Sequence, residues 1–424
     1  AKSDIPILYK QNVANDLFQL IYVFDMGNNH DKALGTAFDY LEYLGTSDMT
    51  PEELKSEFYR LACTFYVSPG NERTYVVLSG LNENMPAAVQ LFEKLLADAQ
   101  VNKEAYTNMT SDILKARSDA KLNQGQNFSR LMSFAMYGPK SPATNLLTEA
   151  ELTNMNPQEL VDRIHNQNSY KHRILYYGPS SSKDLLATIN QYHQVPAALK
   201  DIPAGNEYSY LETPVTKVLV APYDAKQIYM AQISNLDKKY DPAIEPIRAL
   251  YDEYFGGGMN SIVFQEMRET RGLAYSAWAS IMPPSYLKYP YVLRTQIATQ
   301  NDKMIDAVTT FNDIINNMPE SEAAFKLAKD GLTNRLRTER IIKGDIIWSY
   351  INAQDLGQNV DPRIKLYNDI QNMSLKDIVD FQKQWVKGRT YVYCILGDKK
   401  DLELDKLKAV GPIEELTQEQ IFGY

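Results

Sequence analysis

Cysteine and histidine are scarce in this chain of 424 residues, which has two cysteines and four histidines. Cys63 and Cys394 each lie in an apolar stretch typical of a buried strand, where a free thiol behaves as a small apolar residue. A disulfide framework is excluded, whereas the redox compartment is left open. The histidines are His30, His165, His172 and His193. No two have the spacing that joins side chains on a helix, so we predict surface or capping roles and no metal site.

Long apolar runs and basic clusters are also absent from the sequence. No run approaches the roughly 20 residues that span a bilayer, and Ala1–Asp4 lacks the charge-then-apolar pattern of a signal peptide. We expect any targeting segment to have been removed or to belong to a longer parent, which leaves the localisation unknown. A bacterial periplasmic location would follow if the parent carries a signal peptide. The formal charge of −9 includes no basic cluster for a phosphate backbone, so no nucleic-acid partner is expected.

Two parts of the chain resemble each other in sequence. The segment Asn154–Asp162 is similar to Asn372–Asp380, an offset of 372 − 154 = 218 residues. In both copies a helical pattern and then an apolar strand ending in glycine follow. The residues 195–207 contain two prolines and a glycine and are typical of a linker. We therefore predict a first module at residues 1–205 and a second at 206–424.

Within each module, β-branched and aromatic runs precede long amphipathic stretches. Leu17–Phe24 and Gln227–Ser234 are typical of strands. Apolar residues at intervals of three and four predict the helices Met85–Ala99, Lys103–Leu122, Asp302–Asn317 and Ser321–Arg340. The predicted fold class is α+β, with two tandem homologous modules, each a mainly antiparallel sheet with helices packed on one face.

The most informative segment is Tyr254–Tyr275. It has a glycine-rich turn at Gly256, Gly257 and Gly258, an amphipathic pattern over Met259–Glu269, and then Arg268 and Tyr275 seven residues apart. The glycines can adopt positive φ and allow close approach of other groups. This string resembles the signature of the second domain in the pitrilysin/insulinase family of zinc metallopeptidases. The resemblance implies that the three glycines support a substrate chamber. The resemblance implies that Arg268 and Tyr275 support catalysis at a zinc site carried by a different half of the enzyme.

A plainer interpretation is open for the same two residues. On spacing alone, Arg268 would be a surface ion-pair partner of Glu266 or Glu269, and Tyr275 a core aromatic residue. The combined string favours the family signature. When the copies are overlaid at an offset of 212 residues, Ser56 is aligned with Arg268 and Cys63 with Tyr275. The pair is therefore expected only in the second module.

The inverted zinc motif of this superfamily, H-x-x-E-H, is not conserved in the first module. Asp39 and Tyr43 stand where histidines are needed, and only Glu42 matches the motif. The third ligand of the family, a later glutamate, aligns near Ala116. We therefore predict that this chain binds no zinc or other cofactor, and the resemblance implies zinc in the partner half.

The leading hypothesis is a non-catalytic half that closes over a half bearing H-x-x-E-H to form a chamber for hydrolysis of unfolded peptides. The catalytic half would belong to the same parent polypeptide or to a separate subunit, and this chain alone is predicted to be inactive. The alternative is a fully non-catalytic structural or peptide-binding subunit with the same fold. An unrelated enzyme activity has no support, because the sequence offers no nucleophile–base arrangement, phosphate loop or ligand cluster.

Overall fold

The computed structural model describes residues 1–424, which form two compact units. The first unit comprises Ala1–Ser118, Asn145–Glu207 and Ile341–Trp348, and the second comprises Asp119–Thr144, Tyr208–Arg340 and Ser349–Tyr424. Each unit contains one sheet. None of the helices is both long enough and apolar enough to cross a membrane. The module boundary near residue 205 stays a prediction, because each compact unit also contains a short segment from the other predicted module.

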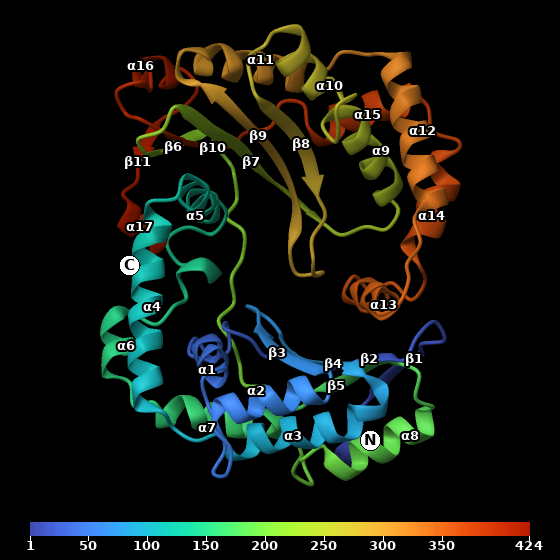
Figure 1. The fold of residues 1–424 in the computed structure, drawn as a ribbon. Coiled ribbons are helices and arrows are strands. Elements are labelled where there is room, and N and C mark those ends of the chain that lie inside the picture. The colour runs from blue at the N-terminus through green and yellow to red at the C-terminus, as the bar shows by residue number, and fades with distance from the viewer. The chain divides into compact units, whose positions relative to one another are not determined.

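The sheet of the first unit has the order β1-β5-β2-β4-β3 (Figure 1). Its strands are β1 (Ile7–Gln11), β2 (Leu17–Phe24), β3 (Cys63–Pro69), β4 (Thr74–Leu81) and β5 (Arg173–Gly178). The pair β1 and β5 is parallel, and the other neighbours are antiparallel. Strand β3 forms an edge of the sheet, and its residues alternate between buried and more exposed positions, as expected for a strand with one covered face.

The sheet of the second unit repeats this order as β6-β10-β7-β9-β8, with β11 added beside β6. Its strands are β6 (Lys217–Pro222), β7 (Gln227–Lys239), β8 (Ser276–Met282), β9 (Pro290–Gln300), β10 (Val392–Gly397) and β11 (Ile413–Glu415). Again the first pair, β6 and β10, is parallel, and β10, β7, β9 and β8 follow in antiparallel order. The shared order and pairing agree with the predicted tandem modules of an α+β fold.

The helices are formed by amphipathic segments with clear starting signals. For example, Thr50 makes a capping box with Glu53, and Pro51 occupies the first turn of α2. The helices up to residue 192 are α1 (Leu34–Leu41), α2 (Pro51–Arg60), α3 (Met85–Asp98), α4 (Lys103–Lys121), α5 (Gln124–Tyr137), α6 (Glu149–Asn154), α7 (Gln158–Asn166) and α8 (Ser182–Tyr192). The later helices are α9 (Glu245–Phe255), α10 (Ile262–Phe264), α11 (Met304–Asn316), α12 (Glu322–Thr338), α13 (Asp345–Asp355), α14 (Pro362–Ile370), α15 (Leu375–Trp385), α16 (Leu404–Leu407) and α17 (Gln418–Phe422).

Apolar side chains of the helices bury one face of each sheet. In the first unit, Phe92 of α3 and Ile164 of α7 share a core with Tyr22 of β2. In the second unit, α9, α11 and α15 cover one face of the sheet. Helix α5 also contributes to a core on the other face, where Phe128 and Leu131 pack with residues of β6, β7 and β10. Strand β10, covered on both faces, is buried at every residue.

Candidate functional site

The family-like segment of the second unit folds into a short helix beside an edge strand. Ser261 caps the start of α10, its Oγ accepting a hydrogen bond from the N–H of Phe264 at 3.4 Å. Helix α10 continues as one π-helical turn, Gln265–Thr270, so the observed helix begins and ends slightly later than the predicted Met259–Glu269. Gly272, at φ 58°, takes the left-handed conformation that follows a helix end. Strand β8 then begins at Ser276 and forms an edge of the sheet.

The structure brings Arg268 and Tyr275 together. The guanidinium carbon of Arg268 lies 5.7 Å from the ring centroid of Tyr275 and 5.0 Å from that of Phe264. Its Nε also lies 3.6 Å from a carboxylate oxygen of Glu269. The ion pair anticipated by the plainer interpretation is therefore present, but both side chains are about half exposed, and such pairs contribute at most about 1 kcal/mol.

Tyr275 is not a core residue. Its side chain is 73% exposed, although its backbone N–H donates to the carbonyl oxygen of Ala298 at 2.9 Å. The backbone is thus fixed beside β9 while the phenol faces solvent. An anchored backbone with an exposed aromatic ring next to a cation is an arrangement suited to contacts with another molecule.

The three adjacent glycines differ in how much space surrounds them. None of Gly256, Gly257 and Gly258 has positive φ, so the backbone freedom that glycine allows is not used at these positions. Another group does approach Gly256 closely, since a Cβ at this position would lie 2.2 Å from the carbonyl oxygen of Ala279 in β8. At Gly258 a Cβ would meet no atom within 4 Å. A role of the glycines in supporting a substrate chamber stays a prediction, and the geometry shows that Gly256 fits the end of α9 against β8.

An ionic cluster fixes α9 against the other end of the same strand. Asp252 accepts hydrogen bonds from the N–H of Ile281 and from Ser280 Oγ, both at 2.9 Å, and from Arg248 Nη1 at 2.7 Å. Burial raises the pKa of the Asp252 carboxyl to about 6, against the lowering effect of Arg248 and of the two hydrogen bonds from β8. These contacts occupy the outer edge of β8 near Ile281, so the strand is held in place beside Tyr275.

The residues at the position of the family's zinc motif do not fit a zinc ion. Asp39 lies exposed on α1, Glu42 at its C-cap and Tyr43 directly after it, and none offers an imidazole. The pKa of Asp39 is raised by partial desolvation and then by the charge of Glu42. No group of three or more His, Cys, Asp and Glu side chains has a geometry that could hold a metal ion. Ala116, near the expected third ligand, offers no ligand atom.

Two histidines have a role that the sequence did not reveal. The rings of His172 and His193 are buried, and their Nε2 atoms lie 2.8 Å apart. His193 Nδ1 lies 2.6 Å from Glu93 Oε1, and the other oxygen of this buried carboxylate accepts from Asn168 Nδ2 at 3.0 Å. The predicted surface or capping role is wrong for this pair. The predicted capping role does fit His30, since its Nδ1 accepts a hydrogen bond from the N–H of Gly27 at 3.1 Å.

Comparison with known sequences supports the interpretation of the second domain. The sequence model of the family described as "Peptidase M16 inactive domain" matches residues 174–332. The Non-peptidase homolog YmxG of Helicobacter pylori is 23% identical over 422 residues, which cover 94% of this chain and 93% of that protein. An uncharacterized zinc protease of Rickettsia felis is 20% identical over 263 residues, and the match covers 59% of this chain and 60% of that protein.

Solved structures share the fold. The peptidase M16 inactive domain from Pseudomonas fluorescens aligns with a TM-score of 0.72 at 15% identity, over 94% of this chain and 97% of that one. The periplasmic protease PqqL from Escherichia coli aligns with a TM-score of 0.71 at 14% identity, over 93% of this chain but only 44% of that protease. Residues 174–332 therefore match the inactive-domain family of M16 peptidases, and the chain as a whole has the fold of such proteins, in agreement with the resemblance to the pitrilysin/insulinase family.

Proposed function

We propose that this chain closes over a zinc-bearing half of an M16 peptidase and contributes Arg268 and Tyr275 to the binding of peptide substrate and reaction intermediate. The zinc and the catalytic glutamate would come from the partner half, which carries H-x-x-E-H. Unfolded peptides are the substrate class, because a closed chamber excludes large folded proteins. In this family the substrate adds as a strand to a sheet edge of the catalytic half, a main-chain contact that tolerates many sequences.

The observation that carries the proposal is the exposed cation–phenol pair at the start of β8. Attack of water on a peptide carbonyl produces a tetrahedral intermediate with negative charge on oxygen. A guanidinium and a phenol O–H are donors suited to that charge, and they act most strongly where a closed chamber excludes water. The phenol of Tyr275 makes no hydrogen bond within the chain, so its O–H is available for such a contact.

The lengths of the similar proteins support a two-half arrangement. The periplasmic protease PqqL shares this fold, and the present chain covers 44% of it. A protease of this kind therefore contains about one further chain length beyond the part that resembles this protein. The residues at the zinc position in this chain do not fit zinc, which leaves the metal to the other half.

The test is reconstitution with the zinc-bearing half encoded beside this chain or preceding it in the parent polypeptide. Cleavage of a fluorogenic peptide should require both halves. Arg268→Ala and Tyr275→Phe should each lower kcat by about 100-fold, the typical loss when one oxyanion donor is removed, while the affinity of the two halves stays within about threefold.

Arg271→Ala is the matched control. Arg271 lies three residues further on, is similarly exposed, and forms its own ion pair with Glu266. It should leave kcat within about twofold, because losing a surface ion pair has little effect. Unchanged turnover in both Arg268→Ala and Tyr275→Phe would refute the proposed roles.

A fully non-catalytic structural or peptide-binding subunit is the second candidate. The relative named as a non-peptidase homolog favours it, since that similarity extends over 93% of the relative's length. The two candidates give different results in the same assay. A stable complex with a zinc-bearing half whose turnover does not depend on this chain would support the second candidate.

A further inference from the structure

A pocket in the first unit lies between the start of α1, helix α7 and the segment after α8, away from Arg268 and Tyr275 in the sequence and outside their unit. It has a volume of about 320 Å³. Helix α7 contributes Glu159, Asp162 and Arg163 to its wall, Gln167 follows that helix, and Lys200 comes from the segment after α8. Charged groups of both signs therefore surround one small cavity.

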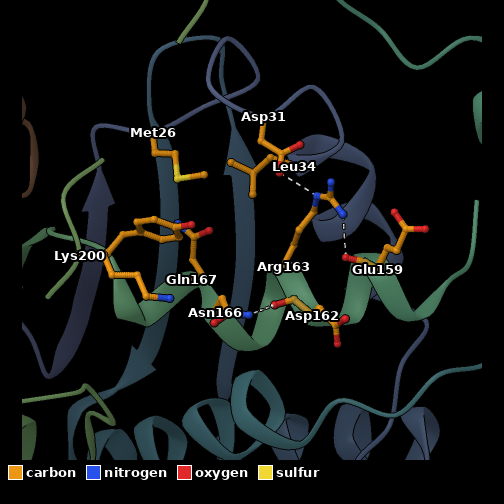
Figure 2. A pocket seen from close by; sticks show the side chains of 10 residues that line it. Met26, Asp31, Leu34, Glu159, Asp162, Arg163, Asn166, Gln167 and Lys200 are labelled. Atoms are coloured by element: carbon orange, nitrogen blue, oxygen red, sulfur yellow. Dashed lines mark hydrogen bonds and ion pairs between the residues drawn. The ribbon is translucent and has the colours of Figure 1, made fainter. Parts of the chain in front are cut away.

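Gln167 is the most informative residue of this pocket. Its side chain extends from the end of α7 into the pocket (Figure 2), and the residue is only 1% exposed. Neither its Nε2 nor its Oε1 has a hydrogen-bond partner in the protein. The next residue, Asn168, is tied to the buried Glu93 carboxylate, so the turn cannot easily rotate the amide toward solvent. A buried amide is costly when unpaired, so a bound partner that both donates and accepts hydrogen bonds would stabilise this one.

The charged side chains of the pocket define the rest of that ligand. Arg163 is already neutralised, because its Nε lies 2.7 Å from Asp31 Oδ2 and its Nη1 donates to the carbonyl oxygen of Glu159 at 2.8 Å. The carboxylates of Glu159 and Asp162 and the ammonium of Lys200 line the pocket without an ion-pair partner in the chain. Asp162 Oδ1 accepts a hydrogen bond from Gln158 Nε2 at 2.8 Å, and Lys200 Nζ lies 5.7 Å from the ring centroid of Tyr170. A ligand that complements them carries an ammonium and an acidic group. A phosphate would face two carboxylates, and a metal ion would face the ammonium, so both fit less well.

We propose that this pocket binds a small zwitterion, a free α-amino acid or a dipeptide with an apolar side chain. Its carboxylate would accept from Lys200 Nζ and Gln167 Nε2. Its ammonium would donate to Asp162 or Glu159 and to Gln167 Oε1. The apolar side chain would contact Met26 and Leu34, which line the same cavity. This inference does not depend on the proposed function, because the pocket and the Arg268–Tyr275 pair belong to different compact units.

The test is isothermal titration of the whole chain with L-leucine. Isocaproate and isoamylamine, which keep only one of the two charges, serve as comparison ligands. L-leucine should bind at least about tenfold more tightly than either, and Gln167→Met, which keeps the side-chain length without the amide, should weaken leucine binding by at least about tenfold. Lys171→Gln is the matched control, since Lys171 is an exposed lysine paired with Asp201 outside the pocket, and its variant should bind leucine as the wild type does.

The proposal is overturned if leucine gives no binding up to about 10 mM, or if it binds equally well to wild type and Gln167→Met. Should Gln167→Met fail to fold, Lys200→Gln takes its place, because that side chain is exposed, and it too should weaken leucine binding by at least about tenfold. A crystal structure of the wild type grown with leucine gives an independent result. Density for the amino acid against Gln167 supports the proposal, and an ordered water alone at the amide refutes it.

Discussion

Acidification should destabilise the first unit through the imidazole of His172. Its Nδ1 lies 2.7 Å from the carbonyl oxygen of Tyr170, so Nδ1 carries a proton and Nε2 accepts from Nε2 of His193. A second proton would have to enter at Nε2, where it would face the N–H of His193. Burial lowers the pKa of His172 from 6.5 to about 4, with a further lowering by His193, against the opposing hydrogen bond to Tyr170.

The sign and size of the effect follow from this pKa. Because the folded value lies below the unfolded value, protons bind the unfolded chain more tightly, and the stabilisation is complete above pH 6.5 and lost as the pH falls toward 4. At about 1.36 kcal/mol for each unit of difference, the full loss in unfolding free energy is about 3 kcal/mol. About 2 kcal/mol of it should disappear between pH 7 and pH 5. That is a large share of the stability of a typical domain.

Two measurements check the prediction. The chain has only four histidines, so their ring protons can be followed one by one in an NMR titration, and the His172 signal should titrate below pH 5. Urea unfolding at pH 7 and pH 5 gives the energetic consequence. His172→Gln should lose about 2 kcal/mol less than the wild type between these values. His165→Gln is the control, because His165 is exposed on α7, and it should follow the wild type.

Carboxylates that lie far from His172 act on wild type and variants alike, so the comparison between proteins removes their contribution. Equal losses of unfolding free energy in wild type and His172→Gln would refute the reasoning. A His172 signal that titrates near pH 6.5 would refute it independently, because the ring would then be free to take its second proton in the folded protein.

Two other predictions concern the second unit's glycines and the metal content. Gly256→Ala should lower the unfolding free energy by about 1 to 3 kcal/mol, since its Cβ would lie 2.2 Å from a backbone oxygen of β8, whereas Gly258→Ala should change it by less than about 0.5 kcal/mol. Urea unfolding of the two variants would contradict this if their effects were equal. The purified chain should hold less than about 0.1 zinc ion per molecule by mass spectrometry, because the zinc position has no imidazole, and one tightly held zinc per chain would contradict that expectation.

Local periodicity was sufficient to locate most elements. The predicted strand Leu17–Phe24 has the same bounds as β2, and the helices predicted from Met85 and Lys103 begin at those residues. Sheet order and the parallel pairing of β1 with β5 were not predictable, because they depend on contacts between residues far apart in the chain. The position of α5 is another such case. Its apolar face packs on the sheet of the second unit, although its sequence lies within the first predicted module.

The site was predictable only where its residues form one continuous motif. Arg268 and Tyr275 are near each other in sequence, and the structure brings their side chains together. The buried histidine network gave no such signal, because His193 is 21 residues from His172 and 100 residues from Glu93. The sequence likewise gives no indication of a role for Gln167. A glutamine after a helix becomes informative only when its amide is seen buried without a partner.

The first copy of the module is an internal control for the second. Ser56 and Cys63, aligned with Arg268 and Tyr275, lie on α2 and at the start of β3, which is an edge strand as β8 is. Cys63 is 1% exposed, whereas Tyr275 is 73% exposed. The same scaffold therefore forms with a small buried residue at this position and requires neither a cation nor a phenol there. The fold alone therefore does not account for an arginine beside an exposed tyrosine in the second copy, and this difference between the copies supports the proposed contacts of Arg268 and Tyr275 with substrate.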